Sequence, residues 1–114
     1  MARLDTTEPM AQATGVSTDN GEVYATFEHT FVDSWTKTEK DFSFRFSKPN
    51  KAAIRLFQKA ASRDATNASR NMLVNHIHPE EKTAFLAAID EYPAIVTSYI
   101  GAVMKGVGLA DLGN

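Results

Sequence analysis

A ridge of basic side chains is the feature of this sequence best suited to binding chemistry. Between positions 48 and 63 the basic residues recur every three or four positions, the spacing that keeps side chains on one side of an α-helix. They are Lys48, Lys51, Arg55, Lys59 and Arg63. Such a ridge attracts anions, and three environments are compatible with it: solvent with some pairing to acidic residues, an acidic protein segment, or nucleic acid.

The uneven distribution of charge along the chain bears on these three readings. Residues 48–78 contain six basic and one acidic side chain, a local charge of +5, whereas residues 79–114 contain two basic and five acidic side chains, a local charge of −3. The whole chain of 114 residues has a formal net charge of −2, and aromatic residues do not interleave with the ridge. Both observations disfavour nucleic acid as the partner.

A second candidate surface is the apolar segment 94–107, which we expect to be helical. Its apolar side chains cover an arc of about 200°, which is wider than a helix lying on one core requires. Either this helix is central in the fold, or part of its apolar surface binds another chain, and a homo-oligomer is compatible with the second reading. The residues predicted to bind a partner are Val96, Tyr99, Ile100, Val103 and Met104.

Catalytic and metal-binding patterns are missing from the sequence. The chain has no cysteine, no serine in a nucleophile elbow and no glycine-rich phosphate loop. His76 and His78 resemble a metal-binding pair, but they lie near an expected helix end and are better read as helix-capping groups. His29 falls on an apolar strand face, where we expect it to be half-buried and hydrogen-bonded. We therefore expect a protein that is not an enzyme and that has no cofactor or metal.

The elements that position these residues follow from hydrophobic periodicity. Apolar residues alternate over 23–31 and again over 42–46, which predicts an antiparallel β-hairpin. Four helices are expected to follow, and the first should pack its apolar side on the hairpin. Their starts are marked by Pro49, Asp64, Pro79 and Pro93. The first is expected to end near Arg63 and the last near Val107.

The predicted fold class is therefore α+β, with an N-terminal antiparallel β-hairpin packed on a bundle of about four short α-helices. Residues 1–20 have few large apolar side chains and are expected to be a flexible leader. Residues 21–114 are expected to form one domain, with the hairpin in 21–47 and the helices in 48–109. No signal-peptide pattern or membrane-length apolar run is present, so a cytoplasmic protein without a membrane partner is expected.

The region from Phe42 to Gly108 resembles the small tail assembly chaperones of long-tailed bacteriophages and prophages. The likeness rests on FSFRFSKPNKAAIRLFQKAA, on SRNMLVNHIHPEEKTAFLAAIDEYPAI and on a closing apolar helix that ends in GVG. The shared order is an aromatic strand that runs into a Lys-Pro helix start, a Leu-Val pair before a Pro-Glu step, and a Tyr-Pro that opens the last helix.

The resemblance implies a protein that acts during virion assembly in the host cytoplasm and is absent from the mature virion. It also implies that the tape measure protein and the tail tube protein are its partners. No residue here matches a family-specific binding position, so the candidate site residues come from amphipathicity alone. Two other functions stay open: a structural tail or connector component of the virion, and a small host regulatory or nucleic-acid-binding module.

Overall fold

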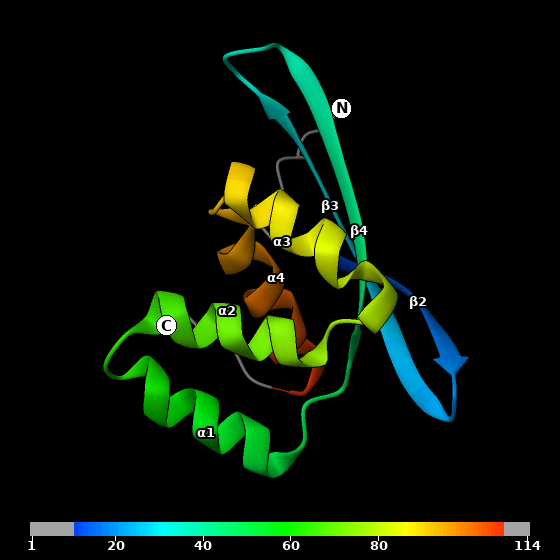
Figure 1. Cartoon of the computed structure of the whole chain (residues 1–114), viewed down its shortest axis with the longest axis vertical. Coiled ribbons are helices and arrows are strands. Elements are labelled where there is room, and N and C mark those ends of the chain that lie inside the picture. The colour runs from blue at the N-terminus through cyan, green and yellow to red at the C-terminus, as the bar shows by residue number, and fades with distance from the viewer. Residues whose placement is uncertain (1–10, 109–114) are drawn as a thin grey trace.

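The computed structural model describes residues 11–108, which form an antiparallel sheet and a set of helices (Figure 1). The strands are β2 (Gln12–Asp19), β3 (Glu22–Asp33) and β4 (Thr38–Ser47). The helices are α1 (Lys51–Ala61), α2 (Ala65–His76), the 3₁₀ turn η1 (Pro79–Glu81), α3 (Lys82–Glu91) and α4 (Ile95–Gly106). The predicted α+β class is confirmed. No helix in the described part of the chain is long and apolar enough to cross a membrane.

The sheet has the order β2-β3-β4, and both pairings are antiparallel. β3 and β4 pair without a break from Tyr24 opposite Ser47 to Asp33 opposite Thr38, so the predicted hairpin is confirmed. β2 joins β3 through Asn20 and Gly21, which have φ angles of 54° and 82°. An Asn-Gly pair favours a two-residue turn of this hand because both positions need positive φ.

The prediction of a flexible leader over residues 1–20 is wrong for the segment that forms β2. Apart from the exposed Val16 its side chains are small or polar, so the segment shows no apolar alternation. β3 nevertheless supplies hydrogen-bond partners for one edge of the strand. Residues 1–10 of the predicted leader lie outside the described residues.

The core lies between the inner face of the sheet and the helices. Phe44 and Phe46 of β4 contact Phe85 of α3 and Tyr99 of α4, with ring centroids between 5.1 and 5.7 Å apart. Leu73 of α2 closes this cluster and is 0% exposed. α4 is therefore central in the fold, and the wide apolar arc predicted for it faces the sheet on one side and α2 on the other.

The helix starts agree with the predictions to within about two residues. α1 begins after Asn50, whose side chain accepts a hydrogen bond from the Ala53 N–H at 2.8 Å, so Pro49 precedes the helix instead of opening it. Asp64 caps α2 as predicted by accepting from the Asn67 N–H at 3.1 Å. These caps satisfy backbone donors that have no partner within the helix.

α1 differs from the prediction in what it covers. It packs against α2, which in turn packs against α4, so its apolar side does not lie on the hairpin as expected. No residue of α1 is buried, and Ile54 and Phe57 are only partly buried against the core. Figure 1 shows α1 at the end of the molecule opposite the hairpin turn. A strongly amphipathic helix thus keeps part of its apolar side open.

Candidate functional site

The prediction that α4 presents an exposed apolar surface is wrong. Tyr99 and Met104 are 0% exposed, and the other three predicted residues are also buried. These three are Val96, Ile100 and Val103. The physical reason is the central position of α4, because the sheet and α2 cover its two sides. Exposed large apolar side chains occur instead at Val16, Val23, Val32, Trp35 and Leu56.

An apolar groove lies between α1 and α4, over one side of α2. One half of it has a volume of about 420 Å³ and is lined by all three helices, with Phe57 from α1, Ser69 from α2 and Thr97 from α4. Val96 and Ile100 also line this half, so each presents an edge of its side chain to the groove. We call the whole feature the α1–α4 groove.

The second half of the α1–α4 groove has a volume of about 580 Å³ and carries the basic residues. Ile54 of α1 and Val107, just after α4, form its apolar part, while Lys51 and Arg55 stand at its edge. Gln58 of α1 is the residue that lines both halves. The structure therefore places two of the predicted apolar residues along this groove together with three basic residues of the ridge, which are Lys48, Lys51 and Arg55.

The remaining basic residues of the predicted ridge are exposed on α1 and after it. Lys59 and Arg63 do not line the groove but extend the positive surface beside it. Within residues 11–108 the ion pairs are those of Arg45 with Glu80 and Glu81 and of His78 with Asp19, so none of them involves the ridge. No described residue therefore forms an ion pair with the ridge.

The groove offers a short amphipathic helix both apolar and basic side chains along α1. α1 has 11 residues and is about 16 Å long, so a partner helix of two to three turns could lie along it. Apolar anchors of such a helix would contact Ile54, Phe57 and Ile100, and acidic residues would lie near Lys51 and Arg55. Binding of a helix in a groove relies on this combination of an apolar floor and a charged edge.

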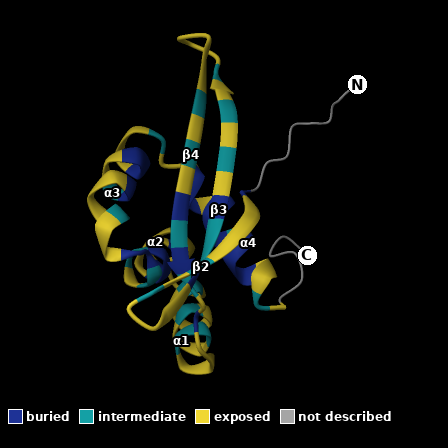
Figure 2. Ribbon diagram, turned by 90° about the vertical axis from the view of Figure 1, so that its right-hand side faces the viewer, coloured by how far each residue is buried: buried dark blue, intermediate teal, exposed yellow. Residues whose placement is uncertain are grey.

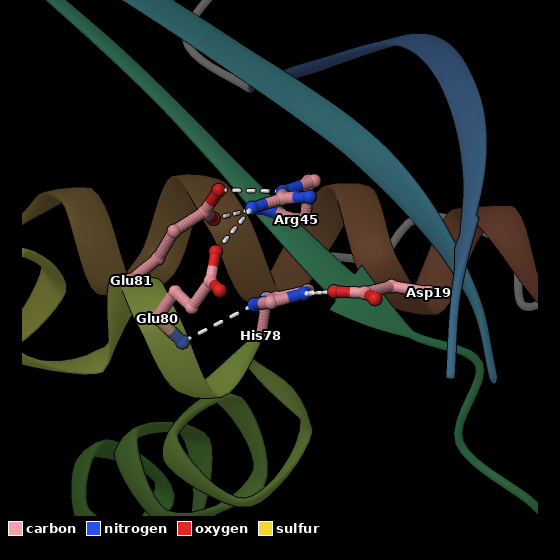
Figure 3. Close-up of polar contacts among 5 residues, drawn as sticks. All are labelled: Asp19, Arg45, His78, Glu80 and Glu81. Carbon is pink, nitrogen blue, oxygen red and sulfur yellow. Dashed lines mark hydrogen bonds and ion pairs between the residues drawn. The ribbon is translucent and has the colours of Figure 1, made fainter. Parts of the chain in front are cut away.

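A polar cluster at the edge of β4 is structural (Figure 3). Glu81 accepts hydrogen bonds from the Arg45 backbone N–H at 2.7 Å and from Arg45 Nε at 2.6 Å. The hydrogen bond to Glu81 raises the pKa of Arg45. The His78 N–H donates to the Arg45 carbonyl at 2.8 Å. Glu81 and His78 together therefore satisfy the backbone N–H and carbonyl of Arg45 at the edge of β4.

His78 extends this cluster to β2. Its Nε2 lies 2.5 Å from the Asp19 carboxylate, and its Nδ1 accepts a hydrogen bond from the Glu80 N–H at 3.1 Å. The His76 ring contacts the Met72 carbonyl at 2.8 Å in the last turn of α2. Both histidines act at helix ends, which confirms the prediction for the pair. In the part of the chain that the structure describes, no group of three or more histidine or acidic residues could hold a metal ion.

Burial and hydrogen bonding shift the pKa values of three further groups. His29 is half-buried, as predicted, with its Nδ1 3.1 Å from Ser98 Oγ, and burial lowers its pKa. The Tyr92 hydroxyl donates to Asp33 at 2.7 Å, which raises the pKa of Tyr92 to about 12. Burial also raises the pKa of Tyr99, whose hydroxyl has no hydrogen-bond partner among the described residues.

Sequence reasoning missed the groove and the polar cluster for the same reason. Arg45 and Glu81 are 36 positions apart, and His78 and Asp19 are 59 positions apart. Neither pairing has a local signature in the sequence. The available signal for the groove was the strong amphipathicity of the segment that forms α1. Its contacts within residues 11–108 cover only part of its apolar side.

Comparisons with known proteins assign a family and a fold. A family model described as a domain of unknown function, DUF6848, matches residues 10–114. The chain is also similar to the solved structure of the uncharacterised protein rbstp2171 from Bacillus stearothermophilus, with a TM-score of 0.60 and 22% sequence identity. That similarity covers 73% of this chain and 82% of the other chain, and at this identity it concerns the fold alone. No curated protein matches the sequence.

Proposed function

The chain belongs to the DUF6848 family, and we propose that it is a helix-binding assembly chaperone of bacteriophage or prophage tails. The observation that carries the proposal is the α1–α4 groove, in which apolar side chains from three helices lie beside a basic edge. The resemblance of residues 42–108 to tail assembly chaperones supports the same assignment. The activity proposed is binding without catalysis.

The groove defines the chemistry of the client segment. A helix that places two or three large apolar side chains between α1 and α4 would gain about 1.5–3 kcal/mol for each one fully buried, before the cost of ordering. Acidic residues on its flank would meet Lys51 and Arg55, which would favour encounter and orientation. The tape measure protein is the proposed client, and recruitment of the tail tube protein is the proposed second step.

This assignment is preferred to nucleic-acid binding because of what surrounds the basic residues. Ile54, Pro49 and Val107 line the same half of the groove as Lys51 and Arg55, and no aromatic residue lines that half. A single-stranded nucleic acid would need aromatic platforms for stacking beside the basic residues. An amphipathic protein helix uses both the apolar and the basic part of the surface. The chaperone is expected to act in the host cytoplasm, and mass spectrometry should not find it in mature virions.

The test is co-purification with the tape measure protein encoded in the same genome. Thr97 is exposed and lines the groove, so Thr97→Trp should fill the groove without disturbing the core. We expect this variant to lose co-purification while its circular dichroism spectrum matches that of the wild type. Thr83→Trp is the matched control, because Thr83 is exposed on α3 outside the groove. Retained binding by Thr97→Trp, or equal loss in the control, would contradict the proposal.

A second pair of variants tests the basic edge. Lys51→Gln combined with Arg55→Gln should weaken client binding and reduce its dependence on salt concentration, since two charged contacts are removed. Lys82→Gln removes a charge from exposed α3 and should leave binding unchanged. If the double variant binds as tightly as the wild type at low salt, the edge does not contact the client.

A further inference from the structure

The outer face of the sheet is acidic along the hairpin. Residues on alternate positions of β3 and β4 point away from the helices, and three exposed carboxylates lie together there. They are Glu28, Glu39 and Asp41, which we call the acidic face. Arg45 is the basic residue of β3 and β4 on this side of the sheet, and it already forms an ion pair with Glu81. Figure 2 shows exposed residues along the part of the hairpin that extends beyond the helices.

The acidic face and the basic ridge cannot pair within one chain. The ridge follows α1, at the end of the molecule opposite the hairpin turn (Figure 1). No ion pair joins the two surfaces within residues 11–108. Each molecule therefore carries two separate surfaces of opposite charge. Its formal net charge is only −2, so two copies repel one another little as a whole.

We propose that the chain associates head-to-tail, with the basic ridge of one copy bound to the acidic face of the next. A second copy of this chain occupies each surface, held there by charge complementarity, so at low salt it competes with the client for Lys51 and Arg55. Because the two surfaces differ, the contact is heterologous, and it can repeat to give short chains of subunits instead of a closed dimer.

The spacing of the charges supports this pairing. Lys51, Arg55 and Lys59 are four residues apart on a helix, so they repeat about every 6 Å along α1. Glu39 and Asp41 are two residues apart on a strand and repeat about every 6.7 Å. Glu28 lies opposite Ser43, which is the next position in the same row. The three basic charges thus extend over about 12 Å, and the three acidic charges, with Glu28 on the neighbouring strand, extend over about 13 Å, so the two sets have similar lengths.

The association should be weak and strongly dependent on salt, because all the charges are exposed. The Debye length falls from about 30 Å at 0.01 M salt to about 3 Å at 1 M salt, so the contact should form at low salt and be lost at high salt. This inference does not rest on the proposed client. The acidic face is remote from the α1–α4 groove, so changes there separate self-association from client binding.

The test is sedimentation velocity of the full chain at about 0.02 M and about 0.5 M salt. We expect concentration-dependent species larger than a monomer at low salt and a monomer at high salt. Two neutralised variants should each be monomeric at low salt. One is Lys51→Gln with Arg55→Gln. The other is Glu39→Gln with Asp41→Asn, in which the side-chain carbonyl of the new amide can still accept the hydrogen bond from Thr30.

Mixing the two variants gives the decisive result. Each retains the surface that the other has lost, so an equimolar mixture at low salt should form a 1:1 heterodimer that cannot grow further. The control is Asp90→Asn with Glu91→Gln, which removes the same charge from exposed positions on α3 and should associate like the wild type. A wild type that stays monomeric at low salt, or a mixture that shows no heterodimer, would overturn the proposal. At about 0.5 M salt, where the wild type is also a monomer, client binding by the Glu39 and Asp41 variant should equal that of the wild type.

Discussion

Replacing Tyr99 with phenylalanine should stabilise the fold by about 1 kcal/mol. Tyr99 is 0% exposed, and its hydroxyl is buried without a hydrogen-bond partner among the described residues. An unsatisfied buried hydroxyl costs about 1–3 kcal/mol, and removing it leaves only a small void against neighbouring rings. The gain should therefore lie at the lower end of that range.

Removing the whole ring should have the opposite effect. The Tyr99 ring lies 5.7 Å from both Phe44 and Phe46 and 6.1 Å from Phe85, so it joins α4 to the sheet and to α3. Truncation of a buried aromatic side chain to alanine costs about 3–5 kcal/mol. The free energy of unfolding of a domain is usually about 5–15 kcal/mol, so Tyr99→Ala should lose a large part of it.

Urea denaturation followed by far-ultraviolet circular dichroism measures both effects. Leu56→Ala is the control, since Leu56 is 68% exposed and its truncation should change stability by less than about 0.5 kcal/mol. A Tyr99→Phe variant that is less stable than the wild type would show that the hydroxyl has a partner. A Tyr99→Ala variant as stable as the Leu56 control would show that α4 is not the core, and the assignment of the groove would fail with it.

Three further predictions concern hydrogen bonds and pH. Glu81→Gln should lower the thermal midpoint, because the amide cannot replace the charged hydrogen bonds to Arg45 at the edge of β4. Burial lowers the pKa of His29 in the folded state below its usual value of 6.5, so stability should fall as pH drops below about 6.5. The thermal midpoint measures this fall, which should be smaller in His29→Gln. The pKa of Tyr92 rises from 10.0 to about 12 through its bond to Asp33, so stability should fall from pH 10 to 12. The fall should be smaller in Tyr92→Phe, in which only the raised pKa of Tyr99 still contributes.

Local signals in the sequence predicted most of the secondary structure. Strict alternation of apolar residues identified β3 and β4, and Asp64 marked the start of α2. Such features depend on neighbours along the chain, so they are readable without the fold. β2 was missed because Val16 is its single large apolar residue, so no alternation is visible. Asn20-Gly21 before an alternating segment is a known hairpin signal and could have found the strand.

The candidate site depended on tertiary packing and could be predicted only in part. Amphipathicity identified the ridge on α1, and Lys51 and Arg55 do line a groove. The same pattern could not decide whether the apolar arc of α4 meets the core or a partner, because both give the same periodicity. The answer depended on α2 lying between α1 and α4, an arrangement set by contacts between residues distant in sequence.

The most direct test of the central claim is a nuclear magnetic resonance titration of the ¹⁵N-labelled chain with acidic amphipathic helical peptides from the tape measure protein. If the α1–α4 groove binds the client, amide shifts should concentrate on Ile54, Phe57, Thr97 and Ile100, while those of the hairpin stay unchanged. Shifts confined to β3 and β4, or no shifts at all with peptides covering the whole client, would contradict the account.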